Sequence, residues 1–141
     1  MTARGVSGSI VCTASVAATS GIDGAVVDYT MSKQAVVGLV MAASAQVGAQ
    51  GVRVNCVSPS YVATPMLCGV TGMGAGEAER WCEPWSRVKG VLKAKHVADA
   101  ALFLASDDSE FITGHNLVVD GGFTAVPGRE FGHVHTGATP S

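Results

Sequence analysis

The sequence predicts an α/β protein in which helices flank a parallel sheet. Three short apolar runs are typical of buried strands, and they lie at residues 8–14, 52–57 and 116–120. Between the first two runs, residues 27–49 are rich in Ala, Val, Leu, Met and Gln, which favours one long helix. A strand, a helix and a second strand make a βαβ unit, whose strands are parallel and whose crossover is right-handed.

Small and helix-ending residues set the boundaries of these first elements. The run Gly8-Ser9-Ile10-Val11-Cys12-Thr13-Ala14 is too short for a stable helix, and the small polar residues 15–24 after it predict a loop. The long helix is expected to end near Gly48 and Gly51. Ser58-Pro59 closes the second strand.

The second half of the chain predicts less regular structure. Residues 60–93 hold four closely spaced glycines and are expected to be irregular, apart from a short helix near 77–87. A helix is expected over 95–106, because its apolar residues share one face, and Gly121-Gly122 ends the third strand. We expect residues 1–126 to form one domain and residues 127–141 to be a disordered tail.

The composition excludes several classes of protein. Hydrophobic residues make up 48% of the chain and charged residues 14%, which is too apolar for a disordered protein. The net charge of −2 gives no bulk attraction to nucleic acid or to an anionic membrane. Nine basic and eleven acidic residues are present, but only five of these twenty precede Glu77. We therefore expect the first 76 residues to be interior, or to have a surface that another chain or a missing segment covers.

The stretch 34–52 has no charge and approaches the length of a membrane span. It also contains three glutamines, a serine and three glycines, which favour a helix buried by protein over one in lipid. The four cysteines form no C-x-x-C pair, and the N-terminus lacks the apolar run of a secretion signal. We therefore expect free thiols, a cytoplasmic location, and neither a membrane nor a nucleic acid as a partner.

The strongest candidate for chemistry is the pair Tyr29 and Lys33, at the start of the long helix. Residues at this i, i+4 spacing project from one face of a helix, about one turn apart. An ammonium group near a phenol favours the phenolate, so such a tyrosine can donate or accept a proton near neutral pH. Ser15 follows the first strand and can hold the reacting oxygen. Tyr-x-x-x-Lys also arises by chance, so the pair alone leaves a helix-surface role open.

The pair belongs to a longer series of motifs. In chain order these are Gly8-Ser9-Ile10-Val11, Ser15, Tyr29, Lys33, Arg53-Val54-Asn55-Cys56-Val57-Ser58-Pro59, Thr113-Gly114 and Val119-Asp120-Gly121-Gly122. In this order and spacing, residues 5–124 resemble the short-chain dehydrogenase/reductase family. Thr13-Ala14-Ser15, Ala63-Thr64-Pro65 and Leu104-Ala105-Ser106-Asp107 are similar to its plant branch with secoisolariciresinol dehydrogenase, xanthoxin dehydrogenase and momilactone A synthase.

The resemblance implies a fold and an activity. The fold is the C-terminal part of a Rossmann-like doubly wound parallel sheet, and the activity is the interconversion of a secondary alcohol and a ketone with NAD or NADP, NAD being favoured. Ser15 would polarise the substrate oxygen, Tyr29 would be the acid/base, and Lys33 would assist Tyr29 and bind the nicotinamide ribose. Pro59, Val62 and Thr64 would line the nicotinamide, together with Ser60 where relatives often have glycine.

The resemblance also implies partners and a substrate pocket. Met66, Leu67, Trp81 and Trp85 are candidates for that pocket, although packing is the ordinary role of such residues. They suggest a lipophilic alcohol or ketone as the substrate. The 27–49 helix would pack against its symmetry mate in a homodimer or homotetramer.

One expected part of the family pattern is missing. The glycine-rich turn that holds the pyrophosphate lies early in the family's chain, and no such segment precedes residue 8. Thr71-Gly72-Met73-Gly74-Ala75-Gly76 imitates it but follows no strand, and Glu77 takes the place of the last glycine. The alternative interpretation is therefore a catalytically inactive fragment that keeps the oligomerisation helices.

Two other kinds of site are disfavoured. No histidine lies near Ser15 or Tyr29 and no G-x-S-x-G turn exists, which argues against acyl transfer. His133 and His135 have no cysteine or acidic cluster around them, so no metal site is expected.

Overall fold

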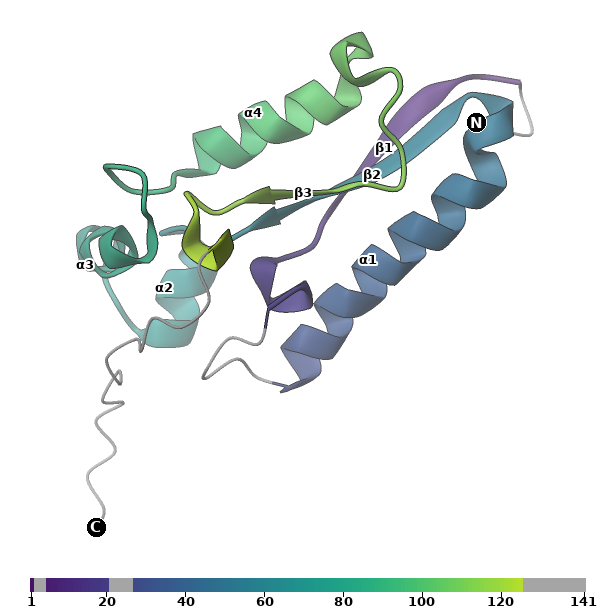
Figure 1. The fold of residues 1–141 in the computed structure, drawn as a ribbon. Helices are drawn as coiled ribbons and strands as arrows, with labels where there is room; N and C mark the ends of the chain where they lie inside the picture. Colours follow the sequence, from purple (N-terminus) through teal and green to yellow (C-terminus); the bar gives the residue numbers. More distant parts are fainter. Residues whose placement is uncertain (2–4, 21–26, 126–141) are drawn as a thin grey trace.

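Three parallel strands form the centre of the structure, a computed structural model that describes residues 1, 5–20 and 27–125. The strands β1 (Gly8–Thr13), β2 (Val52–Pro59) and β3 (Asn116–Val119) lie side by side in the order β1-β2-β3. The long helix α1 (Val27–Val47) covers one face of the sheet, and α4 (Ala94–Ala105) covers the other (Figure 1). The α/β class, the parallel pairing and these two helices confirm the prediction.

Alternate residues of β2 face the two helices, as the pleat of a strand requires. Val52, Val54 and Cys56 are buried in the apolar core with Val40 of α1. On the other face, Arg53 donates hydrogen bonds to the carbonyl oxygens of Leu104 and Ser106, at the C-terminal end of α4. A cation is stabilised there by the carbonyl groups that the helix leaves unpaired. The strand therefore serves as an apolar wall for α1 and a polar anchor for α4.

The expectation of irregular structure over 60–93 is wrong in part. Residues Pro65–Thr71 form α2, and the helix predicted near 77–87 is α3 (Ala75–Cys82) followed by a 3-10 turn at Glu83–Trp85. Residues 64 and 65 set the start of α2. The Thr64 hydroxyl accepts a hydrogen bond from the Leu67 backbone N–H, and Pro65 occupies the first turn. Residues 71–76, whose sequence imitates a phosphate-binding loop, form the end of α2 and the start of α3. Gly72 follows α2 with φ +74°, and Gly74 precedes α3.

Two other boundaries differ from the prediction. β2 continues through Ser58 and Pro59, which were expected to follow it, because the last strand pairs alongside and accepts a hydrogen bond from Ser60 N–H at Val119. The expected loop after β1 contains a 3-10 turn, Val16–Ala18.

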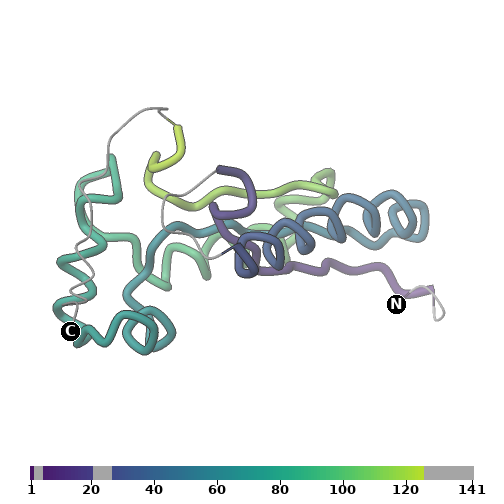
Figure 2. The backbone as a smooth tube through the Cα atoms, turned by 90° about the horizontal axis from the view of Figure 1, so that it is seen from below, coloured from purple at the N-terminus to yellow at the C-terminus, as the bar shows by residue number. Residues whose placement is uncertain are grey.

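α2 and α3 gather at one end of the elongated molecule, away from the N-terminus (Figure 2).

The sequence also led to expectations about the cysteines, membrane spans and metal ligands. The four cysteines are free thiols, and burial raises the pKa of the Cys56 and Cys82 thiols. Within residues 5–20 and 27–125, no helix reaches the length and hydropathy of a membrane span, and no three His, Cys, Asp or Glu side chains gather as metal ligands. The tail 127–141, with His133 and His135, lies outside the described residues.

Asp120 closes the turn after β3. Its carboxylate accepts hydrogen bonds from the Gly122 N–H at 2.8 Å, the Thr124 N–H at 2.8 Å and the Thr124 hydroxyl at 2.6 Å. Burial alone would raise the pKa of Asp120, but these hydrogen bonds outweigh burial and lower it from the ordinary 3.8. Asp120 therefore ties down the turn after β3.

The lowered pKa makes the stability of the turn depend on pH. A carboxyl group with a folded-state pKa below its unfolded value stabilises the fold above the unfolded value, and loses this effect as pH falls through the folded one. Asp120→Asn is expected to lower the free energy of unfolding by about 1–2 kcal/mol at pH 7. The difference in unfolding free energy between wild type and variant should become smaller below pH 3.8. Urea unfolding from pH 3 to 7 measures this gap, and a gap independent of pH would contradict the prediction.

Candidate active site

The predicted site residues come from the ends of β1 and β2 and from the start of α1. In sheets of parallel strands, ligands bind outside the carboxyl ends of the strands. β1 reaches its carboxyl end at Thr13 and β2 at Pro59, and the sheet runs in one direction, so the segments after both strands lie at the same edge. Ser15 and the 60–64 connection start at this edge.

Ser15 is buried, with 8% of its surface exposed, and begins the short turn Val16–Ala18. Its hydroxyl oxygen accepts a hydrogen bond from the Ala17 N–H at 3.2 Å, which fixes the side chain while leaving the hydroxyl hydrogen available. The turn packs against α1, so Ser15 is held next to the helix that carries Tyr29 and Lys33.

Tyr29 and Lys33 lie on one face of the first turns of α1. The Lys33 Nζ is 5.6 Å from the centroid of the Tyr29 ring, and it donates a hydrogen bond to the Thr13 carbonyl oxygen at 3.1 Å. This bond ties the lysine to the end of β1, two residues before Ser15. The Tyr29 side chain is partly open to solvent, with 37% of its surface exposed. The structure therefore brings the end of β1, Lys33 and Tyr29 together.

The four residues predicted to line a nicotinamide ring lie at the end of β2 and in the connection after it. Pro59, Ser60, Val62 and Thr64 are all half-buried, between the sheet and α2. The Thr64 N–H donates to the Val62 carbonyl at 2.8 Å, so this connection turns sharply into α2. The Thr64 hydroxyl oxygen caps α2, so Thr64 has a structural role whether or not it contacts a ligand.

The four predicted pocket residues lie on different elements and differ in exposure. Trp81 and Trp85 are half-buried and their ring centroids are 5.3 Å apart. Leu67 is half-buried, whereas Met66 is exposed on α2. The tryptophans contact two aromatic residues that the sequence analysis missed, Tyr61 and Phe123. Their positions gave a weak signal: Tyr61 directly follows Pro59-Ser60, and Phe123 directly follows Gly121-Gly122.

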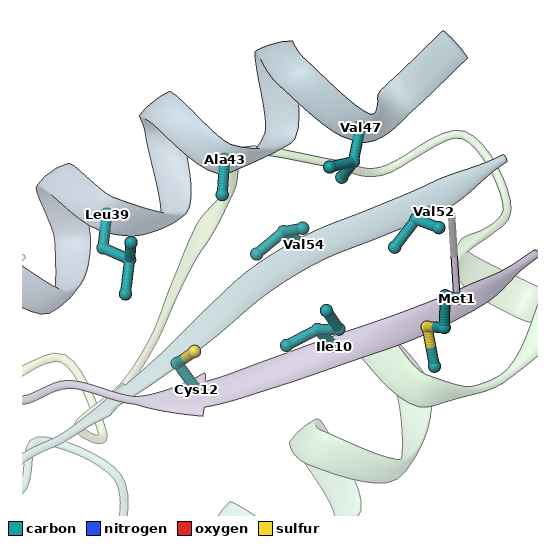
Figure 3. A pocket seen from close by; sticks show the side chains of 8 residues that line it. All are labelled: Met1, Ile10, Cys12, Leu39, Ala43, Val47, Val52 and Val54. Carbon is teal, nitrogen blue, oxygen red and sulfur yellow. The ribbon is translucent and has the colours of Figure 1, made fainter. Parts of the chain in front are cut away.

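A hollow of about 310 Å³ lies elsewhere, between α1 and the β1–β2 edge of the sheet (Figure 3). Apolar side chains line it: Met1, Ile10, Cys12, Leu39, Ala43, Val47, Val52 and Val54. None of these carries a charge or a group that transfers protons at neutral pH, and none belongs to the predicted site. The hollow is therefore an uncovered apolar face and not the site of chemistry.

The chain was compared with families and with known proteins. Residues 1–124 match a family model described as enoyl-(acyl carrier protein) reductase. Short-chain dehydrogenase reductase 4 of Arabidopsis thaliana is 51% identical over 127 residues, which are 89% of this chain and 42% of the relative. The chain belongs to the short-chain dehydrogenase/reductase family.

Two further relatives describe the range of this family. The (−)-isopiperitenol/(−)-carveol dehydrogenase of Mentha piperita, named as mitochondrial, is 44% identical over 90% of this chain and 48% of its own length. A crystal structure of gluconate 5-dehydrogenase from Burkholderia cenocepacia, in complex with NADP and tartrate, superimposes with a TM-score of 0.74 at 28% identity, over 88% of this chain and 47% of that one. The chain thus spans about half the length of the family members that it matches.

The donor groups at the site fit one end of a nicotinamide dinucleotide. Lys33 uses one hydrogen on the Thr13 carbonyl, and an ammonium group has three, so two remain for ribose hydroxyl groups. Within residues 5–20 and 27–125, no strand leads into a glycine-rich turn at a helix N-terminus, which is the usual seat of the pyrophosphate. Lys33 would hold the nicotinamide ribose, as the family resemblance implies.

Proposed function

We propose that this chain carries the proton-transfer and nicotinamide side of an NAD(P)-dependent oxidoreductase that interconverts a secondary alcohol and a ketone. The observation that supports this most is the joint placement of Tyr29 and Lys33, with Lys33 tied to the carbonyl of Thr13 at the end of β1. Membership of the family makes this arrangement meaningful, because the same pair on an unrelated helix is an ordinary surface feature.

Each side chain has a distinct task in the proposed reaction. Ser15, fixed by the Ala17 N–H, donates its hydroxyl hydrogen to the substrate oxygen. Tyr29 takes the proton from an alcohol, or returns it to a ketone, on that same oxygen. Lys33 holds its ammonium group beside the Tyr29 ring, 5.6 Å from the centroid, and binds the nicotinamide ribose. When bound, the nicotinamide accepts or supplies the hydride.

The substrate is proposed to be a lipophilic secondary alcohol or its ketone. The segment after β2 presents apolar and aromatic side chains, including Leu67, Trp81 and Trp85, close to the connection that follows Pro59. One relative is named for two such alcohols, isopiperitenol and carveol. NAD is favoured over NADP by the plant-branch resemblance, and the cytoplasmic location likewise stays a prediction.

The proposed oligomer is a homodimer or homotetramer built on α1. Large apolar side chains of this helix are exposed, at 64% for Met31, 61% for Leu39 and 62% for Met41. Exposed apolar side chains on a helix suit burial against another protein. The competing interpretation, an inactive piece that retains this helix, predicts the same self-association without cofactor binding.

Cofactor titration separates the two interpretations. The two tryptophans of the chain, Trp81 and Trp85, sit in one cluster beside the connection after β2, so their fluorescence reports on this region. We expect NADH or NADPH to quench this emission and to raise the melting temperature of the purified chain, since a ligand that binds the folded state stabilises it.

Lys33→Met is the informative variant in this titration. It removes the ammonium group and keeps most of the side-chain length, so cofactor affinity should fall by roughly tenfold, the loss of one charge-assisted hydrogen bond. Lys95→Met, on exposed α4 with an Asp99 partner, is the matched control and should bind as wild type does. No response to any of NAD, NADH, NADP and NADPH would reject the proposed activity for this chain.

A further inference from the structure

Four aromatic rings from distant parts of the chain meet at the carboxyl end of the sheet. Tyr61 lies after β2, Trp81 in α3, Trp85 in the following 3-10 turn, and Phe123 after β3. The Tyr61 ring centroid is 4.9 Å from that of Trp81, 5.0 Å from that of Trp85 and 6.1 Å from that of Phe123. Tyr61 and Trp85 thus each contact the other three rings, and the interplanar angles of Tyr61 with its neighbours, 85°, 49° and 69°, suit aromatic attraction.

The turn after β3 makes a second connection to the same segment. The Gly121 carbonyl oxygen accepts hydrogen bonds from the Arg87 N–H at 2.8 Å and the Val88 N–H at 3.2 Å. Gly121 has φ +59°, and a Cβ placed on it would collide with the Ser86 hydroxyl oxygen and lie 3.1 Å from the Ser86 Cβ. Glycine is therefore required here for two reasons, a left-handed backbone and the close approach of residues 86–88.

These two connections hold the segment 65–88, which includes α2 and α3. None of the residues of α2 is buried, and Met66 and Val70 are exposed at 67% and 82%. In α3, Ala78 and Cys82 are buried. The aromatic cluster and the turn at Gly121 thus act together with the buried face of α3 to hold the segment in place.

The cluster also lies near the proposed catalytic group. The pKa of Tyr61 is raised by burial, and the neighbouring Cys82 thiol and Tyr29 phenol add to this. β1 and β2 are adjacent and parallel, so Tyr61, which follows the end of β2, lies at the same edge of the sheet as Thr13, to which Lys33 is hydrogen-bonded. A shift of the cluster would therefore alter this edge of the sheet and leave Tyr29, Lys33 and Ser15 themselves unchanged.

We propose that Tyr61 and Gly121 are positioning residues that lock the segment 65–88 against the sheet, so that they set the affinity for the substrate and leave the proton-transfer step unchanged. This role rests on the proposed function for its substrate. The lock itself is a property of the chain and can be measured without turnover.

The lock is tested first by the fluorescence of the two tryptophans, both of which belong to the cluster. Gly121→Ala should move their emission to longer wavelength and increase quenching by acrylamide, because the added Cβ displaces Ser86 and strains the left-handed backbone of the turn. Gly38→Ala is the matched control, since a Cβ at position 38 of α1 meets nothing within 4 Å. Emission and quenching of Gly121→Ala equal to those of Gly38→Ala would overturn the lock.

A second pair of variants keeps the test decisive if Gly121→Ala does not fold. Tyr61→Leu removes the ring and should give the same red shift and increased quenching, whereas Tyr61→Phe keeps the ring and should restore the wild-type values. Circular dichroism confirms that each variant retains its helices. A leucine variant with wild-type emission, or a phenylalanine variant as altered as the leucine one, would overturn the role of the Tyr61 ring.

Steady-state kinetics tests the link to the substrate. With a lipophilic secondary alcohol such as carveol and NAD, Gly121→Ala should raise KM roughly tenfold and change kcat by less than about threefold, the pattern of lost binding shared by ground and transition states. An equal fall of kcat and kcat/KM would overturn the positioning role. Absence of turnover in wild type would reject the proposed function alone, because the fluorescence result still decides whether the lock exists.

Discussion

Tyr29→Phe is expected to lower kcat by about 10²–10⁴-fold, the usual contribution of a positioned general acid or base. The substitution removes only the hydroxyl group, and the ring stays beside the Lys33 ammonium, 5.6 Å from its centroid. Because Tyr29 is 37% exposed, its hydroxyl contributes little to folding, so the melting temperature should stay close to that of wild type. KM should change far less than kcat. Steady-state kinetics with NAD and a secondary alcohol, beside a thermal melt, measures both.

The control for this substitution is Ser32→Ala, in the same turn of α1. The Ser32 hydroxyl donates to the Tyr29 carbonyl oxygen, is exposed, and has no part in the proposed chemistry. It should therefore keep kcat within about twofold of wild type, as surface substitutions away from special features do. A Tyr29→Phe variant that keeps kcat within the same range would remove Tyr29 from the mechanism and leave the pair with its structural interpretation.

The parts of the fold that were predicted from sequence are those with a strong local pattern. The apolar runs at β1, β2 and β3 and the chargeless stretch of α1 needed no knowledge of tertiary contacts, because each pattern is typical of one kind of element. α2 was missed since seven residues with four hydrophobic side chains, a proline and a glycine give no clear period. Its boundaries were nonetheless visible in Thr64-Pro65 and Gly72, which are common helix-start and helix-end residues.

The candidate site was predicted less completely, and the reason is distance along the chain. Tyr29 and Lys33 are four residues apart, so helix geometry alone places them on one face. In the aromatic cluster, Tyr61 contacts Phe123, which is far away in sequence. No local sequence pattern predicts such a contact. Only the structure brings the turn after β3 against the segment that precedes α4.

The motif around β2 gives a second case in which contacts explain what the sequence left open. Asn55 is fully buried in the middle of an apolar strand, where an amide side chain is unfavourable unless it is hydrogen-bonded. Its amide nitrogen donates to the Ile112 carbonyl at 2.8 Å, and its oxygen accepts from the His115 N–H at 2.9 Å. Ser58 donates to the Asn116 side chain at 2.6 Å. These side chains fix β3 beside β2, so their role is structural and not chemical.

Asn55→Leu is accordingly expected to be strongly destabilising, by about 3 kcal/mol, because two backbone groups lose their partners and each such loss costs about 1–3 kcal/mol. Leucine keeps the branching at Cγ and is larger than asparagine, so a cavity does not account for the loss. A domain is typically stable by about 5–15 kcal/mol, and this change removes a large part of that range. Urea unfolding followed by circular dichroism measures the difference.

The matched control is Gln46→Leu, which exchanges an amide for the same apolar side chain at an exposed position of α1. Its unfolding free energy should stay within about 0.5 kcal/mol of wild type. If Asn55→Leu were as mild as this control, the bonds of Asn55 to residues 112 and 115 would not be what holds β3 in register. β3 would then be held by the neighbouring bonds to the segment before it, from the Arg53 guanidinium to the Ile112 carbonyl oxygen and from the Val54 N–H to the Thr113 hydroxyl oxygen.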